Sequence, residues 1–313
     1  MAQGIDTGSS GAGPRDPEEL EASDRATLAE ISPLTTMGEV HLTVSDLATS
    51  LDYYRRQVGL EVLEEGTGRA TLGVAGRSLL VLFEVPGALP ALGHTGLYHF
   101  ALVVPRRADL AGWLAHAAYD RVPLAGVADH FVSEALYLTD PDHHGIEIYW
   151  DRPRELWEGQ VASRLTTQSL DIDGLLGEIE APSTEPYRGL PGGTVMGHLH
   201  LKVASVAATV EFYQQLMGFG LMAQLGSQAA FLSAGGYHHH LGANTWESAG
   251  ASAPPSGAAA LRHATIMLPD SVERDRVLGR VTAAAMAPDE FEGNPVVRDP
   301  SGNALVLAVD GQR

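Results

Sequence analysis

The chain has 313 residues and a formal net charge of −19, with 39 acidic residues against 20 basic ones. This excess of acids argues against a general nucleic-acid binder, because such proteins need cations to displace counterions from phosphates. Cysteine is absent, which excludes a disulfide framework and a zinc–thiolate site, so any metal must be held by nitrogen and oxygen.

The first segment, residues 1–36, is rich in Gly, Ser and acids and is expected to be a disordered acidic tail. It lacks the basic start and apolar run of a signal peptide. No stretch of the chain approaches the roughly 20 apolar residues that a membrane helix needs. We therefore expect a cytoplasmic protein that binds neither membranes nor nucleic acid.

An internal repeat organises the rest of the chain. Residues 37–44 (MGEVHLTV) resemble residues 196–203 (MGHLHLKV), and residues 99–105 (HFALVVP) resemble residues 263–269 (HATIMLP). A third pair, Asp-Pro at 140–141 and at 299–300, precedes a final apolar strand in each half. Each half therefore carries two related units.

Each unit has the order strand, helix and then several strands. After the strand at 38–44, Ser45 or Asp46 can cap a helix, and strand candidates separated by glycine-containing turns follow. The pattern βαβββ, repeated four times, predicts an α+β fold. We expect a first domain at 37–151, a linker at 152–194 with some helix, and a second domain at 195–310.

Three of the expected strands each carry one metal-type ligand on the face opposite their aliphatic residues. Because side chains alternate along a strand, His41 points away from Val40 and Leu42. The same holds for His99 and for Glu147 on their own strands. Two histidines and one carboxylate facing a common interior would form the facial triad that leaves open positions on a non-haem Fe(II) ion.

Four βαβββ units with such ligands resemble the vicinal oxygen chelate superfamily, which includes glyoxalase I, bleomycin-resistance proteins and extradiol dioxygenases. Residues 129–141 and 145–149, together with 236–240 and 244–246, look like two-domain bacterial catechol 2,3-dioxygenases. The resemblance implies that adjacent units pair, giving two incomplete mixed-sheet barrels. It also implies that His41, His99 and Glu147 are the metal ligands.

The resemblance also suggests two catalytic residues. Tyr137, ten residues ahead of Glu147, matches a tyrosine that extradiol enzymes use to orient and protonate oxygen species. His130 lies in an Asp-His-x-x-Ser stretch that resembles the surroundings of their metal, and a histidine can shuttle a proton near neutral pH. The alternative for Tyr137 is a strand aromatic with a satisfied hydroxyl.

The second half lacks a complete ligand set, because Val306 stands where Glu147 stands in the first half. We therefore expect one working site, in the first half. If residues 238–240 lie on a strand, His238 and His240 share a direction. The roles of several second-half histidines stay open: His198, His200, His238, His240 and His263.

The sequence thus predicts an extradiol dioxygenase that uses Fe(II), with Mn(II) as the alternative metal, and takes a small aromatic diol and O2. One rival is a glyoxalase-like isomerase or thiol transferase, whose sites normally recruit a fourth protein ligand. Another is a metal-free resistance protein that sequesters an aromatic compound. The particular catechol and the oligomeric state stay open, a homo-oligomer being one option.

Overall fold

The computed structural model describes residues 31–179 and 187–309. The expected acidic tail lies outside the described residues as far as residue 30. Its last residues, 31–35, are described and are packed against the protein: Ile31 is buried, and its backbone N–H donates to the carbonyl oxygen of Gly218 at 3.0 Å.

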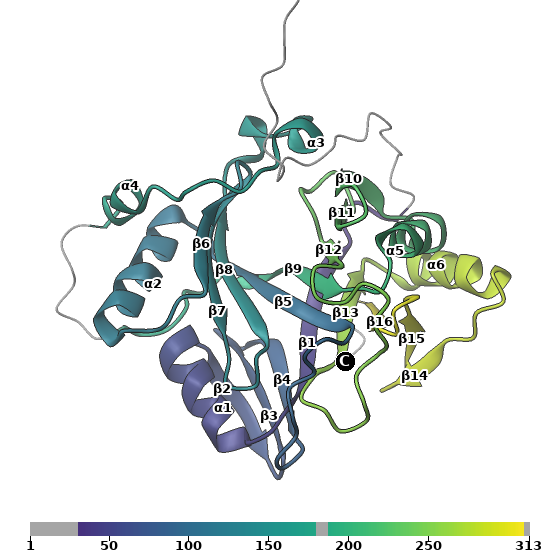
Figure 1. Ribbon diagram of the computed structural model, residues 1–313, viewed down its shortest axis with the longest axis horizontal. Helices are drawn as coiled ribbons and strands as arrows, with labels where there is room; N and C mark the ends of the chain where they lie inside the picture. Colours follow the sequence, from purple (N-terminus) through teal and green to yellow (C-terminus); the bar gives the residue numbers. More distant parts are fainter. Residues whose placement is uncertain (1–30, 180–186, 310–313) are drawn as a thin grey trace, which may run out of the picture.

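Four units follow one another, each a strand, a helix and three further strands, which confirms the predicted βαβββ repeat (Figure 1). The first unit comprises β1 (Thr36–Val44), α1 (Leu47–Tyr53), η1 (Tyr54–Val58), β2 (Glu61–Gly66), β3 (Arg69–Val74) and β4 (Arg77–Glu84). The second comprises β5 (Gly96–Val103), α2 (Arg107–Asp120), β6 (Gly126–Asp129), β7 (Ser133–Thr139) and β8 (Gly145–Asp151).

The second half repeats this order after a connection whose described residues form three short helices. The connection contains η2 (Arg154–Leu156), α3 (Val161–Arg164) and α4 (Ile172–Leu176). The third unit comprises β9 (Val195–Lys202), α5 (Val206–Glu211), η3 (Phe212–Met217), β10 (Gly220–Leu225), β11 (Ala229–Ser233) and β12 (Leu241–Asn244). The fourth comprises β13 (Leu261–Leu268), α6 (Ser271–Ala283), β14 (Asp289–Phe291), β15 (Asn294–Arg298) and β16 (Ala304–Val309).

The helix signals in the sequence act as expected. The Asp46 side chain accepts from the backbone N–H of Thr49 at 2.7 Å and so caps α1. The first helix of each half ends in a π-helical turn, at Gly59 (φ 93°) and Gly218 (φ 89°). Only glycine adopts this left-handed conformation without strain, which explains the repeated glycine.

The strands in the described residues form two eight-stranded mixed sheets. The first and fourth units make one sheet, in the order β14-β15-β16-β13-β1-β4-β3-β2, which we call the 1/4 sheet. The second and third units make the other, in the order β10-β11-β12-β9-β5-β8-β7-β6, which we call the 2/3 sheet. The antiparallel pairs β1–β13 and β5–β9 join the units, and the α+β fold of paired units is confirmed.

The partners of each unit differ from the expectation. We expected units adjacent within one half to pair, whereas each sheet takes one unit from either side of the 152–194 connection. The physical reason is that all four units carry the same strand and helix pattern. That pattern is satisfied equally well by either pairing of first strands, so only the long-range contacts decide between them.

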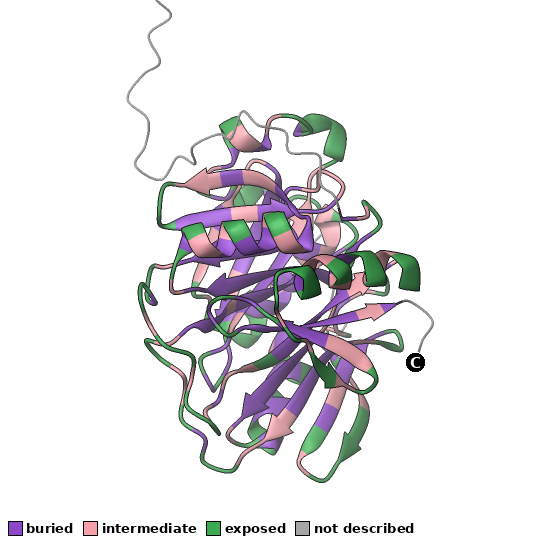
Figure 2. Ribbon diagram, turned by 90° about the vertical axis from the view of Figure 1, so that its right-hand side faces the viewer, coloured by how far each residue is buried: buried purple, intermediate pink, exposed green. Residues whose placement is uncertain are grey.

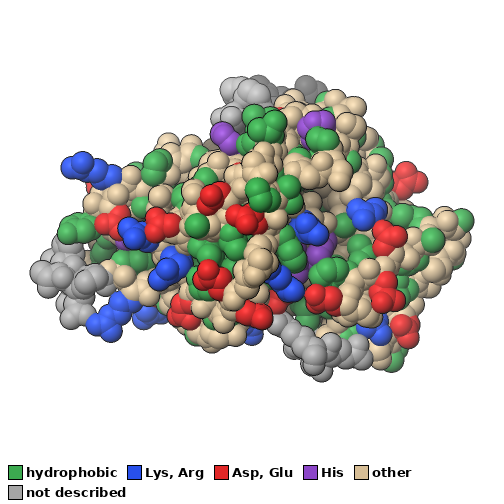
Figure 3. All heavy atoms as spheres, turned by 90° about the horizontal axis from the view of Figure 1, so that it is seen from below, with side chains coloured by type: hydrophobic (Ala, Val, Ile, Leu, Met, Phe, Trp, Pro, Cys, Tyr) green, Lys and Arg blue, Asp and Glu red, His purple; other side chains and the backbone are tan. Residues whose placement is uncertain are grey.

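The aliphatic faces of both sheets belong to one buried cluster. It includes Val40 and Leu42 of β1 and Leu199 and Leu201 of β9. Helices α1 and α2 lie on one side of the strands and α5 and α6 on the other (Figure 1), and the strands are far more buried than the helices (Figure 2). On the face seen in Figure 3, acidic and basic side chains are interspersed with hydrophobic ones.

Two buried tyrosine–aspartate hydrogen bonds connect the sheets. The Tyr54 hydroxyl donates to Oδ2 of Asp140 at 2.8 Å, and the equivalent Tyr213 hydroxyl donates to Oδ2 of Asp299 at 3.3 Å. His144 Nδ1 also lies 2.9 Å from Oδ2 of Asp140. Burial alone would raise the pKa of Asp140, but the charge and hydrogen bonds of His144 outweigh it and lower this pKa. At Asp299, the effect of burial exceeds that of the hydrogen bonds, and the pKa is raised.

These opposite pKa shifts predict that the two Asp→Asn changes reduce the free energy of unfolding by different amounts. The lowered pKa of Asp140 means that folding favours its ionised form, so this stabilisation is present above about pH 4 and is lost as the pH falls through the folded-state value. Asp140→Asn should reduce the free energy of unfolding at pH 7 by about 1–3 kcal/mol and flatten its acid dependence. Urea unfolding between pH 3 and 7 measures both.

Asp299→Asn is the matched control. Folding disfavours the ionised form of Asp299, so a neutral amide at that position should cost less stability at pH 7 than Asp140→Asn does. Equal losses in the two variants, or an unchanged acid slope in Asp140→Asn, would contradict this assignment.

Candidate metal centre and its cavity

Three buried side chains converge on one point of the 2/3 sheet: His99 on β5, Glu147 on β8 and His198 on β9. The Oε2 atom of Glu147 lies 3.0 Å from Nε2 of His99 and 3.1 Å from Nε2 of His198. The two Nε2 atoms are 3.3 Å apart. Among the described residues, this is the group of three placed to hold a metal ion.

Strand register explains the convergence. The central strand β5 pairs antiparallel with β9 and parallel with β8. Ala101 lies opposite both His198 and Glu147, and His99 lies two residues away on the same face. Because Ala101 has a short side chain, the three longer ones can meet above it.

The donor set fits a metal ion. Ligand atoms about 2.1 Å from an ion and at right angles to one another lie about 3.0 Å apart, close to the separations seen here. Burial alone would raise the pKa of Glu147, but the charges and hydrogen bonds of His198 and His99 hold it well below its usual value. Burial lowers the pKa of His198, which favours the neutral imidazole that a metal requires.

His41 does not lie at this centre. The structure brings together His99 and Glu147, as expected, but places His41 in the 1/4 sheet, opposite His263 on β13. Its ring centroid is 4.0 Å from that of His263, and its Nε2 lies 3.3 Å from Oε2 of Glu39. The expectation for His41 assumed that the first two units pair, and His198 from the third unit takes the expected place instead.

The equivalent position of the 1/4 sheet lacks one of the three ligand types. By the repeat, Glu39, His263 and Val306 correspond to His198, His99 and Glu147. Val306 offers no ligand atom, as the sequence predicts. The ring of Phe291 also packs 4.2 Å from that of His263 and 5.6 Å from that of His41, between centroids.

The candidate centre lies in the wall of a cavity of about 750 Å³. Both residues expected to be catalytic, His130 and Tyr137, also line this cavity. The connection between the halves contributes to the wall as well, through Leu165, Thr166 and Thr167. The segment expected to be a linker is therefore part of the site.

Tyr137 and His130 form a hydrogen-bonded pair. Tyr137 lies opposite Glu147 on the neighbouring strand, and its hydroxyl is 2.7 Å from Nε2 of His130. The other ring nitrogen, Nδ1, lies 2.8 Å from the carbonyl oxygen of Thr166, which can only accept. Neutral His130 therefore donates from Nδ1 and accepts the Tyr137 hydroxyl at Nε2. Burial, with the charge of Glu147, raises the pKa of Tyr137 well above its usual value.

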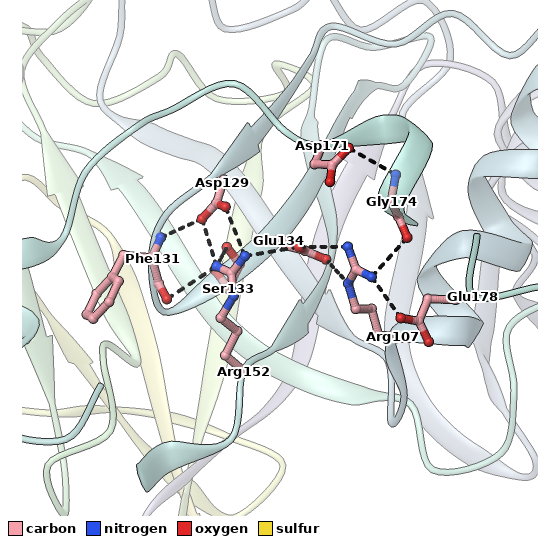
Figure 4. A network of polar contacts seen from close by, with 9 residues as sticks. All are labelled: Arg107, Asp129, Phe131, Ser133, Glu134, Arg152, Asp171, Gly174 and Glu178. Atoms are coloured by element: carbon pink, nitrogen blue, oxygen red, sulfur yellow. Dashed lines mark hydrogen bonds and ion pairs between the residues drawn. The ribbon is translucent and has the colours of Figure 1, made fainter. Parts of the chain in front are cut away.

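A chain of ion pairs holds the turn that carries His130 (Figure 4). Arg152 donates to both carboxylate oxygens of Asp129, at 2.7 and 2.9 Å, and to Glu134 at 3.0 Å. Arg107 donates to the other oxygen of Glu134 at 2.7 Å. Asp129 in turn accepts the backbone N–H of Phe131, whose φ of 66° is in the left-handed region.

On the other side of the centre, His239 lines the cavity, with its ring centroid 4.1 Å from that of His198. His238 lies between Asp151 and His239: its Nε2 is 2.7 Å from Oδ1 of Asp151, and its Nδ1 is 2.9 Å from Nδ1 of His239. Because a carboxylate only accepts, neutral His238 donates from Nε2 and accepts from His239 at Nδ1. This leaves a lone pair on Nε2 of His239.

The sequence did not predict the place of His239. The expectation that His238 and His240 share a direction assumed a strand, whereas β12 begins only at Leu241. The run of three histidines was the available signal. For His198, the available signal was the repeat. It aligns His198 with Glu39, which is two residues from the expected ligand His41 and on the same face of the strand.

Comparison with known proteins agrees with this fold. Residues 36–148 match the family model described as Glyoxalase/Bleomycin resistance protein/Dioxygenase superfamily. A catechol-2,3-dioxygenase of Bacillus subtilis (strain 168) is 40% identical over 281 residues, which cover 88% of this chain and 97% of that protein. The chain belongs to this superfamily, and the relative supports a dioxygenase within it.

Solved structures support the fold. A putative dioxygenase from Bacillus subtilis has a TM-score of 0.57 at 17% identity, over 88% of this chain and 86% of that chain. A glyoxalase I mutant from Zea mays has a TM-score of 0.53 at 15% identity, over 88% of this chain and 94% of that chain. No helix in the described residues has the length and apolarity needed to cross a membrane.

The different places of His198 and His41 predict different effects on metal binding. His198→Ala removes one of the three converging atoms and should lower the affinity for Fe(II) or Mn(II) by at least about 100-fold. His41→Ala, in the other sheet, should bind the metal as the unchanged protein does. Elemental analysis after anaerobic loading and desalting measures both; metal loss in His41→Ala alone would contradict the geometry.

Proposed function

We propose that the protein is an Fe(II)-dependent extradiol dioxygenase, which cleaves catechol or a substituted catechol with O2 to a hydroxymuconic semialdehyde-type product. The observation that carries the proposal is the His99–Glu147–His198 group, set in a cavity beside proton-carrying side chains. The B. subtilis relative, named a catechol-2,3-dioxygenase, supports the same activity. Fe(II) is the proposed metal, with Mn(II) as the alternative.

The number of ligands favours this chemistry. Two imidazoles and one carboxylate on one face leave open positions, and the chemistry that Fe(II) supplies there is simultaneous binding of both diol oxygens and O2. A glyoxalase-like site would recruit a fourth protein ligand, whereas the group found among the described residues has three members. The ligands in this proposal are His99, Glu147 and His198.

The protein side chains supply the proton transfers. A diol hydroxyl beside Tyr137 donates to the Tyr137 oxygen, and the Tyr137 hydroxyl passes its own proton to Nε2 of His130. The carbonyl oxygen of Thr166 accepts from Nδ1 and stabilises the resulting imidazolium. On the opposite side, Nε2 of His239 offers a lone pair to the second hydroxyl. Positioned acid–base groups of this kind accelerate reactions by about 10²- to 10⁴-fold.

The proposal predicts a coloured product and matching oxygen consumption. Anaerobically purified protein loaded with Fe(II) and given catechol and O2 should form a yellow ring-opened semialdehyde. Both atoms of O2 enter this product. An oxygen electrode and an absorbance trace should show one O2 consumed per diol.

Glu147→Gln is the control, since it removes the anionic ligand while keeping the size of the side chain. It should form no product at the same protein concentration. If the metal-loaded protein consumes no O2 with catechol or with several substituted catechols, the proposed activity is wrong.

A further inference from the structure

Lys202 is a buried cation in the wall of the same cavity. It is 9% exposed and lines the cavity together with Tyr98 and Trp246. Lys202 forms no ion pair with any other described residue. The carboxylate that influences its pKa most is that of Glu247, an exposed residue of the cavity wall. Burial lowers the pKa of Lys202 and Glu247 opposes the shift. A lysine whose stem is buried in a cavity wall, and whose ammonium group forms no ion pair with a described residue, can bind an anionic group that enters the cavity.

Strand geometry places Lys202 at a fixed distance from the metal centre. His198, His200 and Lys202 are alternate residues of β9, so their side chains share one face of the sheet. At about 3.3 Å per residue, the Cα atoms of His198 and Lys202 are about 13 Å apart. This spacing along the strand suits a diol whose ring lies at the centre and whose short substituent points toward Lys202.

Aromatic rings surround the space between the centre and Lys202. The Tyr98 ring lies 5.2 Å from that of His200 and 5.3 Å from that of Trp246, between centroids, and His200 and Trp246 are 5.6 Å apart. Gly242 leaves room for the His200 ring, because a Cβ there would come within 2.8 Å of it. Trp246 is 48% exposed and so marks the mouth of the cavity. These rings favour an aromatic substrate lying along β9.

We propose that Lys202 binds an anionic group on the ring substituent, so that the preferred substrates are catechols whose short side chain ends in a carboxylate. This inference rests on the proposed dioxygenase activity. The net charge of −19 repels anions at long range, but screening over about 8 Å at physiological salt confines that effect to the exterior. Inside the cavity, a charge-assisted hydrogen bond to Lys202 outweighs it.

A charge series of substrates tests the inference. The Fe(II)-loaded full chain is given 3-(3,4-dihydroxyphenyl)propionate, 4-methylcatechol and dopamine, which carry anionic, neutral and cationic substituents. The ratio of kcat/KM for the propionate to that for 4-methylcatechol should be at least about 10. Lys202→Met should lower this ratio about 10- to 100-fold, mainly through the KM of the propionate, and Lys202→Arg should keep most of it.

Two further variants distinguish an effect of the local contact with Lys202 from an effect of the net charge of the protein. Glu247→Gln removes the opposing carboxylate and should raise the ratio. Arg55→Met, at an exposed position outside the cavity wall, makes the same change in net charge as Lys202→Met and should leave the ratio as it is. Anaerobic calorimetry with the propionate gives the same comparison as dissociation constants, without turnover.

The outcomes distinguish a failure of this inference from a failure of the proposed dioxygenase activity on which it rests. If 4-methylcatechol or dopamine is turned over but the propionate is not preferred, or if Lys202→Met leaves the ratio unchanged, the role of Lys202 is wrong and the dioxygenase stands. If no diol of the series consumes O2, the proposed activity is wrong, and the substrate inference falls with it.

Discussion

The antiparallel pairing of β5 with β9 is the contact on which the candidate site depends. It joins the second unit to the third, so that one imidazole comes from each half of the chain. The register puts His198 opposite Ala101, two residues from His99 on the same face, so that the two Nε2 atoms lie 3.3 Å apart. Strand β8 adds Glu147 from the other side of β5. The backbone hydrogen bonds of three adjacent strands thus set the positions of the three ligands, which long side chains on loops would hold less rigidly.

The same pairing explains why the connection between the halves belongs to the site. A chain that pairs its second unit with its third must pass from β8 to β9 close to the sheet that both strands share. On this path Trp157, Val161 and Leu165 are buried against Val132, and Thr166 accepts from His130. The 1/4 sheet has the equivalent β1–β13 pairing, but Val306 and the ring of Phe291 occupy its equivalent position. Repetition of the unit thus preserved the scaffold in both sheets, and the described ligand cluster lies in one of them.

What the sequence predicted well lies within single units. Strand alternation and helix caps are local, so the four βαβββ units follow from residue order. His99, His130, Tyr137 and Glu147 all belong to the second unit: three lie on its adjacent strands β5, β7 and β8, and His130 lies in the turn between β6 and β7. The third ligand depends on which first strand pairs with β5, and the similar alternation of aliphatic residues in β1 and β9 leaves that undetermined. His239 escaped prediction because its segment is irregular, and the burial of Lys202 is a property of the tertiary structure, absent from any local pattern.

The position of the metal tests the account most directly. Crystals grown anaerobically with Fe(II) or Mn(II), measured at the absorption edge of the metal, should show one strong anomalous peak bonded to Nε2 of His99, Nε2 of His198 and a carboxylate oxygen of Glu147, at about 2.1 Å each. A peak bonded to His41 in the 1/4 sheet, or metal-loaded crystals with no peak at these three residues, would contradict it.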